Sequence, residues 1–353
     1  MLGNRKFIVD VFGEVKVFTR AWQDDSFFDF AKHEIVPGAI YLISRQQFSA
    51  NIERIRQLAT DEIILPILGN PAEGSETMLR QIQALGILDL VRQNRVLVVT
   101  GGYLQHDIPC LYYENFLPKI LDYQENLDAI DTYWQQWNDS RPYKFLCLNG
   151  RGRWHRRQIL TNLADVLHQA IWTNLDSMSG PIQLLDPKYE FEFYKHNTQL
   201  DQTGYVKYSL FDNQWGEIYL NPQAYLDSYF SLVTETVFEY PHTFRTEKLW
   251  KPIAIGHPFV IVANYGYYRD LRALGFRTFD RFIDESFDLV ENNQDRLAKI
   301  MTLVRHLCRE DLGAFVRQTQ EICKYNQQLL AELSPKIRSQ FPQQFEKFIN
   351  ERS

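Results

Sequence analysis

The chain has 353 residues, a formal net charge of −6 at pH 7 and a sequence pI of about 5.8. Single hydrophobic cores seldom grow to this length, so we expect two domains. An acidic chain without long lysine or arginine runs has no general attraction for nucleic acid or anionic lipid, which excludes both as first expectations. No window is apolar enough to cross a membrane, and no apolar signal core precedes Phe7. Because the 4 cysteines form no zinc or disulfide pattern, we expect a soluble, cytoplasmic protein.

The first part of the chain alternates short β-rich runs with helical runs. Apolar residues recur at helical spacing between Met78 and Leu88. The candidate strands are Phe7–Phe12, Ala39–Ser44, Ile63–Leu68, Arg95–Thr100 and Lys144–Leu148. This alternation predicts a parallel α/β sheet.

A second α/β region follows Asn149. An apolar face from Ile159 to Ile171 predicts a helix, and residues 177–214 lack periodicity, so we expect them to be irregular. Beyond them, the pattern predicts a helix at Pro222–Tyr229, a strand at Ser231–Thr234, a helix at Thr246–Ile255 and a strand at Pro258–Ala263.

The last hundred residues are predicted to be helical. One amphipathic stripe runs from Leu297 to Cys308 and another begins at Leu312, and we expect Pro335 to separate the last two helices. The predicted fold is α/β, with two Rossmann-like domains and C-terminal helices. We expect one domain at 1–143, a second at 144–310 and a helical extension at 311–353. Ligands generally bind such open sheets at the carboxyl ends of the strands.

One loop and the helix after it carry the clearest chemistry. A β-like run ends at Glu235, Thr246 stands at a helix N-cap position, and Lys248 falls in the first turn. Helix-start N–H groups together with Arg245 and Lys248 suit a diphosphate, and Glu235 or Glu247 suits sugar or ribose hydroxyls. The alternative is that Glu247 and Lys248 are only solvated residues of a helix start.

A basic turn, NGRGRWHRR at residues 149–157, predicts a second contact with phosphate. Its glycines allow a close approach of the backbone, and guanidinium groups match phosphate oxygens. The arginines are Arg151, Arg153, Arg156 and Arg157. The turn lacks the third glycine of a dinucleotide fingerprint and is followed by no phosphate-loop lysine. The alternative is a solvated basic helix start.

Asp284, Glu285 and Asp288 form an acidic group that has the composition of a metal site. Acidic residues also favour a helix start through the helix dipole, and we prefer this structural interpretation. We therefore expect no metal ion.

The first domain also offers candidates for a general base, the carboxylate or histidine that deprotonates a hydroxyl group. The candidates at loop positions are Glu73, His106, Asp107 and Glu114, and the sequence does not rank them.

Two segments resemble known glycosyltransferases. Leu232–Glu235 and Phe244–Trp250 resemble the donor-binding motif of the α-1,3-fucosyltransferase family. Residues 149–156 and 271–288 resemble glycosyltransferase-like proteins of phages and bacteria, a likeness that covers roughly residues 144–307.

The resemblance implies a metal-independent transferase with two Rossmann-like domains, the GT-B arrangement. The domain at 1–143 would then be the acceptor-side domain and the domain at 144–310 the donor-binding domain. It also implies that Glu235, Glu247 and Lys248 contact the nucleotide sugar. Phe244 replaces the tyrosine usual in the family, and the loop between the two glutamates differs in length. Both departures leave the donor sugar and nucleotide open.

We therefore expect a hexosyl- or fucosyltransferase-like enzyme that moves a sugar from a nucleotide-diphosphate sugar to a hydroxyl acceptor. The nucleotide sugar is a co-substrate, and no other cofactor is expected. One alternative is a non-catalytic module that binds a nucleotide sugar or phosphate. Another is a phosphoryl-transfer enzyme, although no paired magnesium ligands accompany the basic turn.

Overall fold

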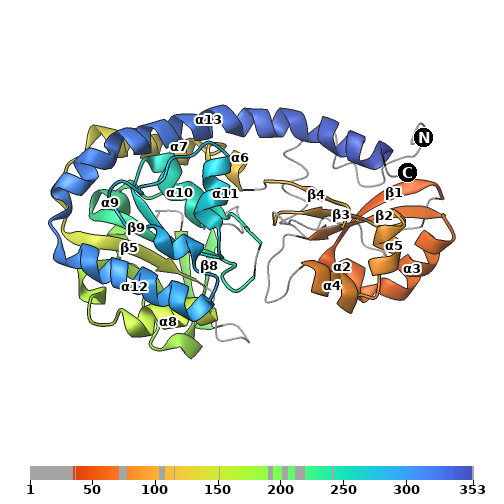
Figure 1. Ribbon diagram of the computed structural model, residues 1–353, viewed down its shortest axis with the longest axis horizontal. Coiled ribbons are helices and arrows are strands. Elements are labelled where there is room, and N and C mark those ends of the chain that lie inside the picture. Colours follow the sequence, from red (N-terminus) through yellow and green to blue (C-terminus); the bar gives the residue numbers. More distant parts are fainter. Residues whose placement is uncertain are drawn as a thin grey trace. The chain divides into compact units, whose positions relative to one another are not determined.

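The computed structural model describes residues 35, 37–70, 78–102, 108–114, 116–150, 152–189, 194–200, 206–210, 219–240 and 242–351. The chain is an α/β protein with two four-stranded, all-parallel, Rossmann-like sheets and a long C-terminal helix (Figure 1). It divides into two compact units, residues 1–115 with 335–353 and residues 116–334. The domain limits expected at residues 143 and 310 describe parts that fold independently. The division into compact units does not test this, so these limits stay predictions.

The first unit holds a sheet in the order β1-β2-β3-β4. Its strands are β1 (Ala39–Ser44), β2 (Ile64–Asn70), β3 (Leu97–Thr100) and β4 (Cys110–Tyr112), and its connecting helices are α2 (Arg45–Ala50), α3 (Ile52–Thr60), α4 (Met78–Ala84) and α5 (Leu88–Arg92). The range predicted for the first of these strands is confirmed. The candidate strand at residues 7–12 lies outside the described residues, and the short strand β4 was not predicted.

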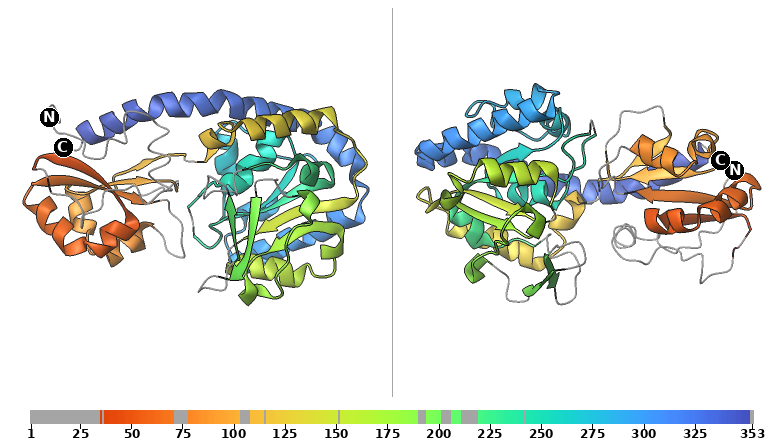
Figure 2. Two further views of the ribbon diagram at one scale, coloured as in Figure 1. Left: turned by 180° about the vertical axis from the view of Figure 1, so that it is seen from behind. Right: turned by 90° about the horizontal axis from the view of Figure 1, so that it is seen from below.

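The core of this unit includes the end of the long helix α13 (Leu312–Asn350). When consecutive strands are neighbours in a parallel sheet, right-handed crossovers place the connecting helices on one face. Phe341, Phe345, Phe348 and Ile349 of α13 are buried in the same core as the strand residues. The C-terminal segment therefore completes the hydrophobic core of the N-terminal sheet (Figure 2).

The second unit holds a sheet in the order β10-β9-β5-β6. These strands are β5 (Tyr143–Asn149), β6 (Ala170–Asn174), β9 (Ser228–Thr234) and β10 (Phe259–Val262). The chain moves outward in opposite directions from the β5–β9 pair, so right-handed crossovers place α8 (Trp154–Asn162) and α10 (Glu247–Ile255) on opposite faces (Figure 1). The order of the strands therefore reverses between β5 and β9.

The remaining helices of the second unit cover both faces of its sheet. Helices α7 (Gln124–Gln135) and α9 (Pro222–Leu226) pack with α10, and α12 (Asn293–Arg309) packs with α8. Two shorter helices are α6 (Leu117–Ile120) and α11 (Tyr267–Ala273). Buried strands flanked by helices on both faces are typical of doubly wound folds.

Three predictions about elements were wrong. The helix expected to reach Ile171 ends at Asn162, because residues 170–174 pair with β5 as strand β6. Tyr229 lies in β9 rather than in the helix before it. Helix α13 continues through Pro335, where its buried side chains continue on both sides of the proline.

The segment expected to be irregular contains short ordered pieces. These are 3-10 turns at Ser177–Ser179 and Pro187–Tyr189 and an antiparallel pair, β7 (Tyr194–Leu200) with β8 (Val206–Leu210). A further 3-10 turn, Leu167–Gln169, precedes β6. None of the helices in the described part of the chain has the length and hydropathy needed to cross a membrane.

Candidate functional site

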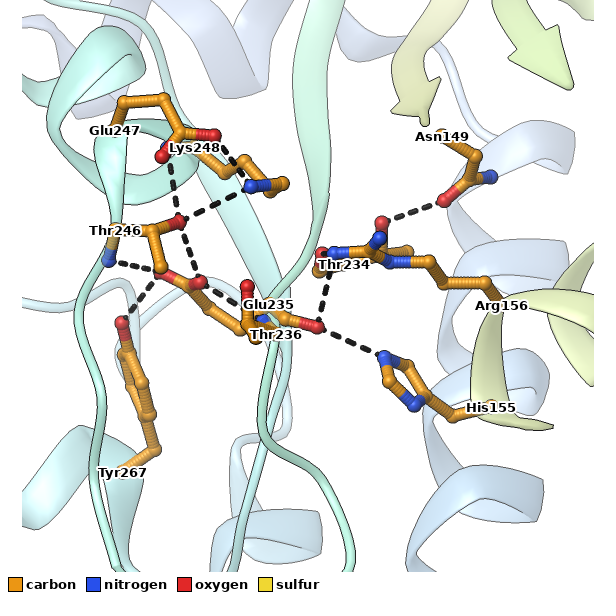
Figure 3. A network of polar contacts seen from close by, with 10 residues as sticks. All are labelled: Asn149, His155, Arg156, Thr234, Glu235, Thr236, Thr246, Glu247, Lys248 and Tyr267. Carbon is orange, nitrogen blue, oxygen red and sulfur yellow. Dashed lines mark hydrogen bonds and ion pairs between the residues drawn. The ribbon is translucent and has the colours of Figure 1, made fainter. Parts of the chain in front are cut away.

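The two segments predicted to bind phosphate meet at the carboxyl edge of the second sheet. The basic turn follows β5, and the loop that begins at Glu235 follows β9. These strands are neighbours, and the strand order reverses between them. In open α/β sheets this reversal is where ligands generally bind. Figure 3 shows the residues that connect the two segments.

Glu235 is fully buried and bonded entirely within the protein. One carboxylate oxygen accepts from the Thr246 amide at 3.0 Å and the Tyr267 hydroxyl at 2.9 Å. The other accepts from the Thr236 amide at 3.1 Å and the Thr246 hydroxyl at 2.7 Å (Figure 3). A carboxylate has about four acceptor sites, so this side chain is saturated. It connects the end of β9 to the start of α10.

Opposing effects act on the ionisation of Glu235. Burial raises the pKa of its carboxyl group, while the nearby Lys248 ammonium and the Thr246 donors lower it by a smaller amount. The net shift of the pKa is upward.

The start of α10 has the cap that the sequence predicted. The Thr246 hydroxyl accepts from the Lys248 amide at 3.3 Å, which confirms Thr246 as the N-cap. The Lys248 side chain is 24% exposed, and its ammonium bonds to the Glu247 carboxylate and to the Thr246 hydroxyl. Glu247 is buried, which raises the pKa of its carboxyl group, but Lys248 and Lys251 together lower it by more, so the net shift is downward. Arg245, just before the cap, is also buried.

Side chains of α8 reach across to the main chain after β9. His155 Nε2 donates to the Glu235 carbonyl at 2.9 Å, and Arg156 donates to the Thr234 carbonyl at 2.9 Å. The Thr234 hydroxyl donates to Asn149 Oδ1 at 2.6 Å. Both α8 residues are buried, so they hold the two segments together rather than facing solvent.

The other arginines of the basic turn have different positions. Arg151 lies outside the described residues. Arg153 is half-buried and occupies the N-cap of α8. Arg157 forms an ion pair with Asp176 at 3.1 Å, in the segment after β6. Arg153 is therefore the described arginine of this turn that combines partial exposure with a position at the helix start.

Gly152 is required by a contact within the protein. A Cβ atom at this position would lie 1.5 Å from Asp176 Oδ2 and 3.1 Å from Arg157 Nη2. The sequence predicted a close approach of the backbone to a ligand. In the structure the close neighbour is the carboxylate of Asp176, which also accepts from the Met178 amide.

Gly152→Ala should therefore destabilise the protein, because the added methyl overlaps the Asp176–Arg157 ion pair. We expect a loss of about 1 to 3 kcal/mol in the free energy of unfolding, measured by urea denaturation. In an Asp176→Ala background the same glycine substitution should cost less than about 1 kcal/mol, because the colliding carboxylate is gone. Equal costs in the two backgrounds would exclude this explanation.

The acidic side chains at 284–288 accept hydrogen bonds from main-chain amides of the protein. Asp284 accepts from the Ser286 amide at 2.9 Å, and Glu285 accepts from the Phe279 amide at 2.7 Å. Asp288 accepts from two amides in the first turn of α11, at 3.0 and 3.2 Å. Searching the described residues finds no group of three or more potential metal ligands.

The general-base candidates are described in part. Glu114 follows β4, is buried and accepts a hydrogen bond from the Tyr112 hydroxyl. Glu73, His106 and Asp107 lie outside the described residues. The structure therefore places one of the four candidates, at the carboxyl edge of the first sheet.

Sequence reasoning missed Tyr267 and Arg296, which help to build this edge. Tyr267 donates to Glu235, and the guanidinium of Arg296 donates to main-chain carbonyls of two loops at the same edge. Neither belongs to a motif with a known spacing. Arg296 is buried in the first turn of an amphipathic helix, a location unusual for arginine. The signal in the sequence is an arginine on the apolar face of that helix.

His257 is a buried, neutral histidine at the opposite edge of the sheet. Its Nε2 donates to the Ser228 carbonyl at 2.7 Å, so Nδ1 accepts from the Ser231 hydroxyl at 3.0 Å. Burial, together with the positive charge of Arg141, lowers the pKa of His257 from 6.5 to about 3.

This shift predicts acid destabilisation. Between pH 6.5 and about 3 the unfolded chain binds a proton at His257 that the native state does not. Stability is thus present above pH 6.5 and is lost as the pH falls, by about 1.4 kcal/mol per pH unit. The difference between the urea midpoints at pH 6.5 and at about pH 4.5 should be smaller for His257→Gln than for the wild type. Identical differences would contradict the assignment.

Comparisons of the chain with protein-family models, curated proteins and solved structures found no significant match.

Proposed function

We propose that this protein is a glycosyltransferase of the GT-B type, which binds a nucleotide-diphosphate sugar at the carboxyl edge of its second sheet. The observation that carries the proposal is the meeting of the basic turn and the Glu235 loop at the reversal of strand order. These segments are about eighty residues apart in the chain, and His155 and Arg156 join them through hydrogen bonds to main-chain carbonyls.

The chemistry of this edge suits a diphosphate. Helices α8 and α10 both begin there, and the N-terminus of a helix presents unpaired N–H groups and a partial positive charge. Arg153 stands at the first of these helix starts and Lys248 at the second. Two helix starts and two cations in one sheet edge favour an anionic ligand.

The contacts refine the roles proposed for individual residues. Lys248 is partly exposed and close enough to the α10 start to bind a diphosphate oxygen. Glu235 is saturated by protein donors, so we assign it to positioning the α10 start rather than to binding sugar hydroxyls. Glu247 is buried and paired with the Lys248 ammonium, so we assign it to orienting Lys248 rather than to binding ribose or sugar hydroxyls. Arg156 and Arg245 are buried, and we assign them to supporting the loop.

The transfer step needs stabilisation of the leaving nucleoside diphosphate. Negative charge develops on the diphosphate as the glycosidic bond breaks, and fixed positive groups at the leaving oxygen lower the barrier. Lys248 supplies such a group, and the positive end of the α10 dipole adds to it. The base that deprotonates the acceptor hydroxyl stays open among Glu73, His106, Asp107 and Glu114.

The arrangement of the chain supports the GT-B assignment. Both units contain a parallel Rossmann-like sheet, and the C-terminal part of α13 belongs to the first unit although most of the helix belongs to the second. The resemblance to fucosyltransferases in Leu232–Glu235 and Phe244–Trp250 is a separate argument for the same assignment.

A panel of nucleotide sugars tests the proposed activity. We expect the wild type to release nucleoside diphosphate slowly from one donor, through hydrolysis or transfer, and to keep this activity in excess EDTA. A chain that binds the donor without releasing diphosphate would instead be a nucleotide-sugar-binding module. Activity that requires a divalent metal would support the phosphoryl-transfer alternative.

A further inference from the structure

Arg296, in the first turn of α12, is a buried cation held by neutral oxygens. The residue is only 1% exposed. The guanidinium donates to the carbonyls of Ala263 at 3.1 Å, Val290 at 2.8 Å, Glu291 at 3.0 Å and Phe238 at 2.6 Å, and to Asn293 Oδ1 at 2.6 Å. An arginine has five N–H donors, so all are used. Within the described part of the chain it forms no ion pair with a carboxylate.

Two of these acceptors lie in loops at the carboxyl edge of the second sheet. Phe238 belongs to the loop between β9 and α10, and Ala263 follows β10 directly. The Phe238 ring lies 4.3 Å from the Arg296 guanidinium carbon and stacks on the His155 ring at 5.0 Å, with 17° between the planes. Arg296 therefore connects α12 to the loop that contains Glu235 and, through Phe238, to the start of α8.

We propose that Arg296 is a positioning residue of the diphosphate site, which fixes the β9–α10 loop so that the starts of α8 and α10 keep their binding geometry. The inference rests on the proposed function, since the ligand is the diphosphate of the nucleotide sugar. Arg296 acts through the Phe238 carbonyl and ring and does not touch the ligand.

The positive charge of Arg296 also favours binding of an anion at this edge. Burial lowers its pKa to about 10, so the side chain remains a cation at neutral pH. Its hydrogen-bond acceptors are neutral, and the Asp288 carboxylate offsets its charge only in part, since the net shift of the pKa is downward. A buried charge is screened less than an exposed one. An anion at this edge therefore gains a favourable interaction with a fixed cation behind the loop.

Arg141 provides a matched control at the opposite edge of the same sheet. It is buried, and its guanidinium donates to the carbonyls of Asn138, Tyr225 and Ser228 and to the Tyr133 hydroxyl. It also lies 5.7 Å from the Tyr133 ring centre. The two arginines thus share burial, carbonyl acceptors and an aromatic contact, and they differ in the edge that they support.

The experiment compares Arg296→Lys with Arg141→Lys. Each substitution keeps the charge and removes most of the hydrogen bonds, so both should lower the melting temperature. Only Arg296→Lys should weaken binding of pyrophosphate and uridine and guanosine diphosphates, by about tenfold in calorimetric titrations. Only this variant should speed hydrogen exchange at the Thr236 and Thr246 amides, which bond to Glu235. Phe238→Leu keeps the carbonyl and should shift both readouts in the same direction if Arg296→Lys does not fold.

Two results would overturn the proposal. The first is an Arg296→Lys variant that binds the probes as tightly as the wild type and exchanges both amides at the wild-type rate. If Arg296→Lys does not fold, the same result in Phe238→Leu counts instead. The other is an equal change in both readouts in Arg141→Lys, which would mean general destabilisation. A wild type that binds none of the three probes would refute the proposed function, while the exchange comparison would still decide whether Arg296 positions the loop.

Discussion

Glu235→Gln is expected to lower the free energy of unfolding by about 2 to 4 kcal/mol, because it leaves a buried amide without an acceptor. Each oxygen of Glu235 accepts one backbone N–H, from Thr246 on one side and from Thr236 on the other. A glutamine has a single acceptor oxygen, so in either orientation its NH₂ group faces a backbone donor. Hydroxyl groups can rotate to accept, but the two backbone amides cannot. Urea denaturation at neutral pH measures the loss.

Tyr267→Phe is the control for this prediction. It removes one hydroxyl donor to Glu235 and leaves both backbone amides paired, so it should cost only about 1 kcal/mol. If Glu235 instead bound sugar hydroxyls directly, Glu235→Gln would reduce donor affinity with little change in stability. A glutamine variant as stable as the wild type would therefore contradict the structural role argued here.

Lys248→Ala should weaken the binding of nucleoside diphosphates by about tenfold to a hundredfold, since a charge-assisted hydrogen bond contributes about 1.5 to 3 kcal/mol. The variant should also lose about 1 kcal/mol of stability, because Glu247 is buried and its carboxylate is paired with the Lys248 ammonium. Calorimetric titration well below the melting temperature separates the two effects.

Lys251→Ala is the control for the charge. Lys251 lies in the same helix and also acts electrostatically on Glu247, but it stands one turn farther from the helix start. We expect it to change diphosphate affinity by less than about threefold, because Lys251 is partly exposed and its charge, one turn away, is screened. Equal losses in both lysine variants would show a general effect of charge, and no loss in Lys248→Ala would remove this residue from the site.

Local patterns in the sequence predicted several elements well. The run Ala39–Ser44 is β1, and Thr246 is the N-cap of α10, because strand composition and caps depend on neighbouring residues. The placement of the basic turn between a strand and a helix start was also predicted. These features follow from interactions within a few residues of the chain.

Elements that depend on distant contacts were not predictable. Residues 170–174 form β6 because they pair with β5, although their apolar pattern also fits a helix. Pro335 remains inside α13, where the buried stripe holds the helix in place against the usual cost of an internal proline. In both cases tertiary packing overrides the local preference.

The roles of the site residues were also predictable only where they depend on neighbouring residues in the chain. The sequence indicated that Glu235, Arg156 and Lys248 belong to one site, and the structure brings Glu235 and Arg156 to the same edge through main-chain contacts. It did not reveal that four donors of the protein saturate Glu235, because three of those donors, in Thr246 and Tyr267, are more than ten residues away. The contribution of Arg296 depends on carbonyl groups, which carry no signal in side-chain identity.

Hydrogen exchange with and without a bound nucleotide sugar tests the central claim most directly. If the diphosphate binds at the carboxyl edge of the second sheet, a donor that binds should slow amide exchange in the first turns of α8 and α10. The rest of the second sheet should change little. Binding that protects other segments and leaves both helix starts unchanged would contradict this account.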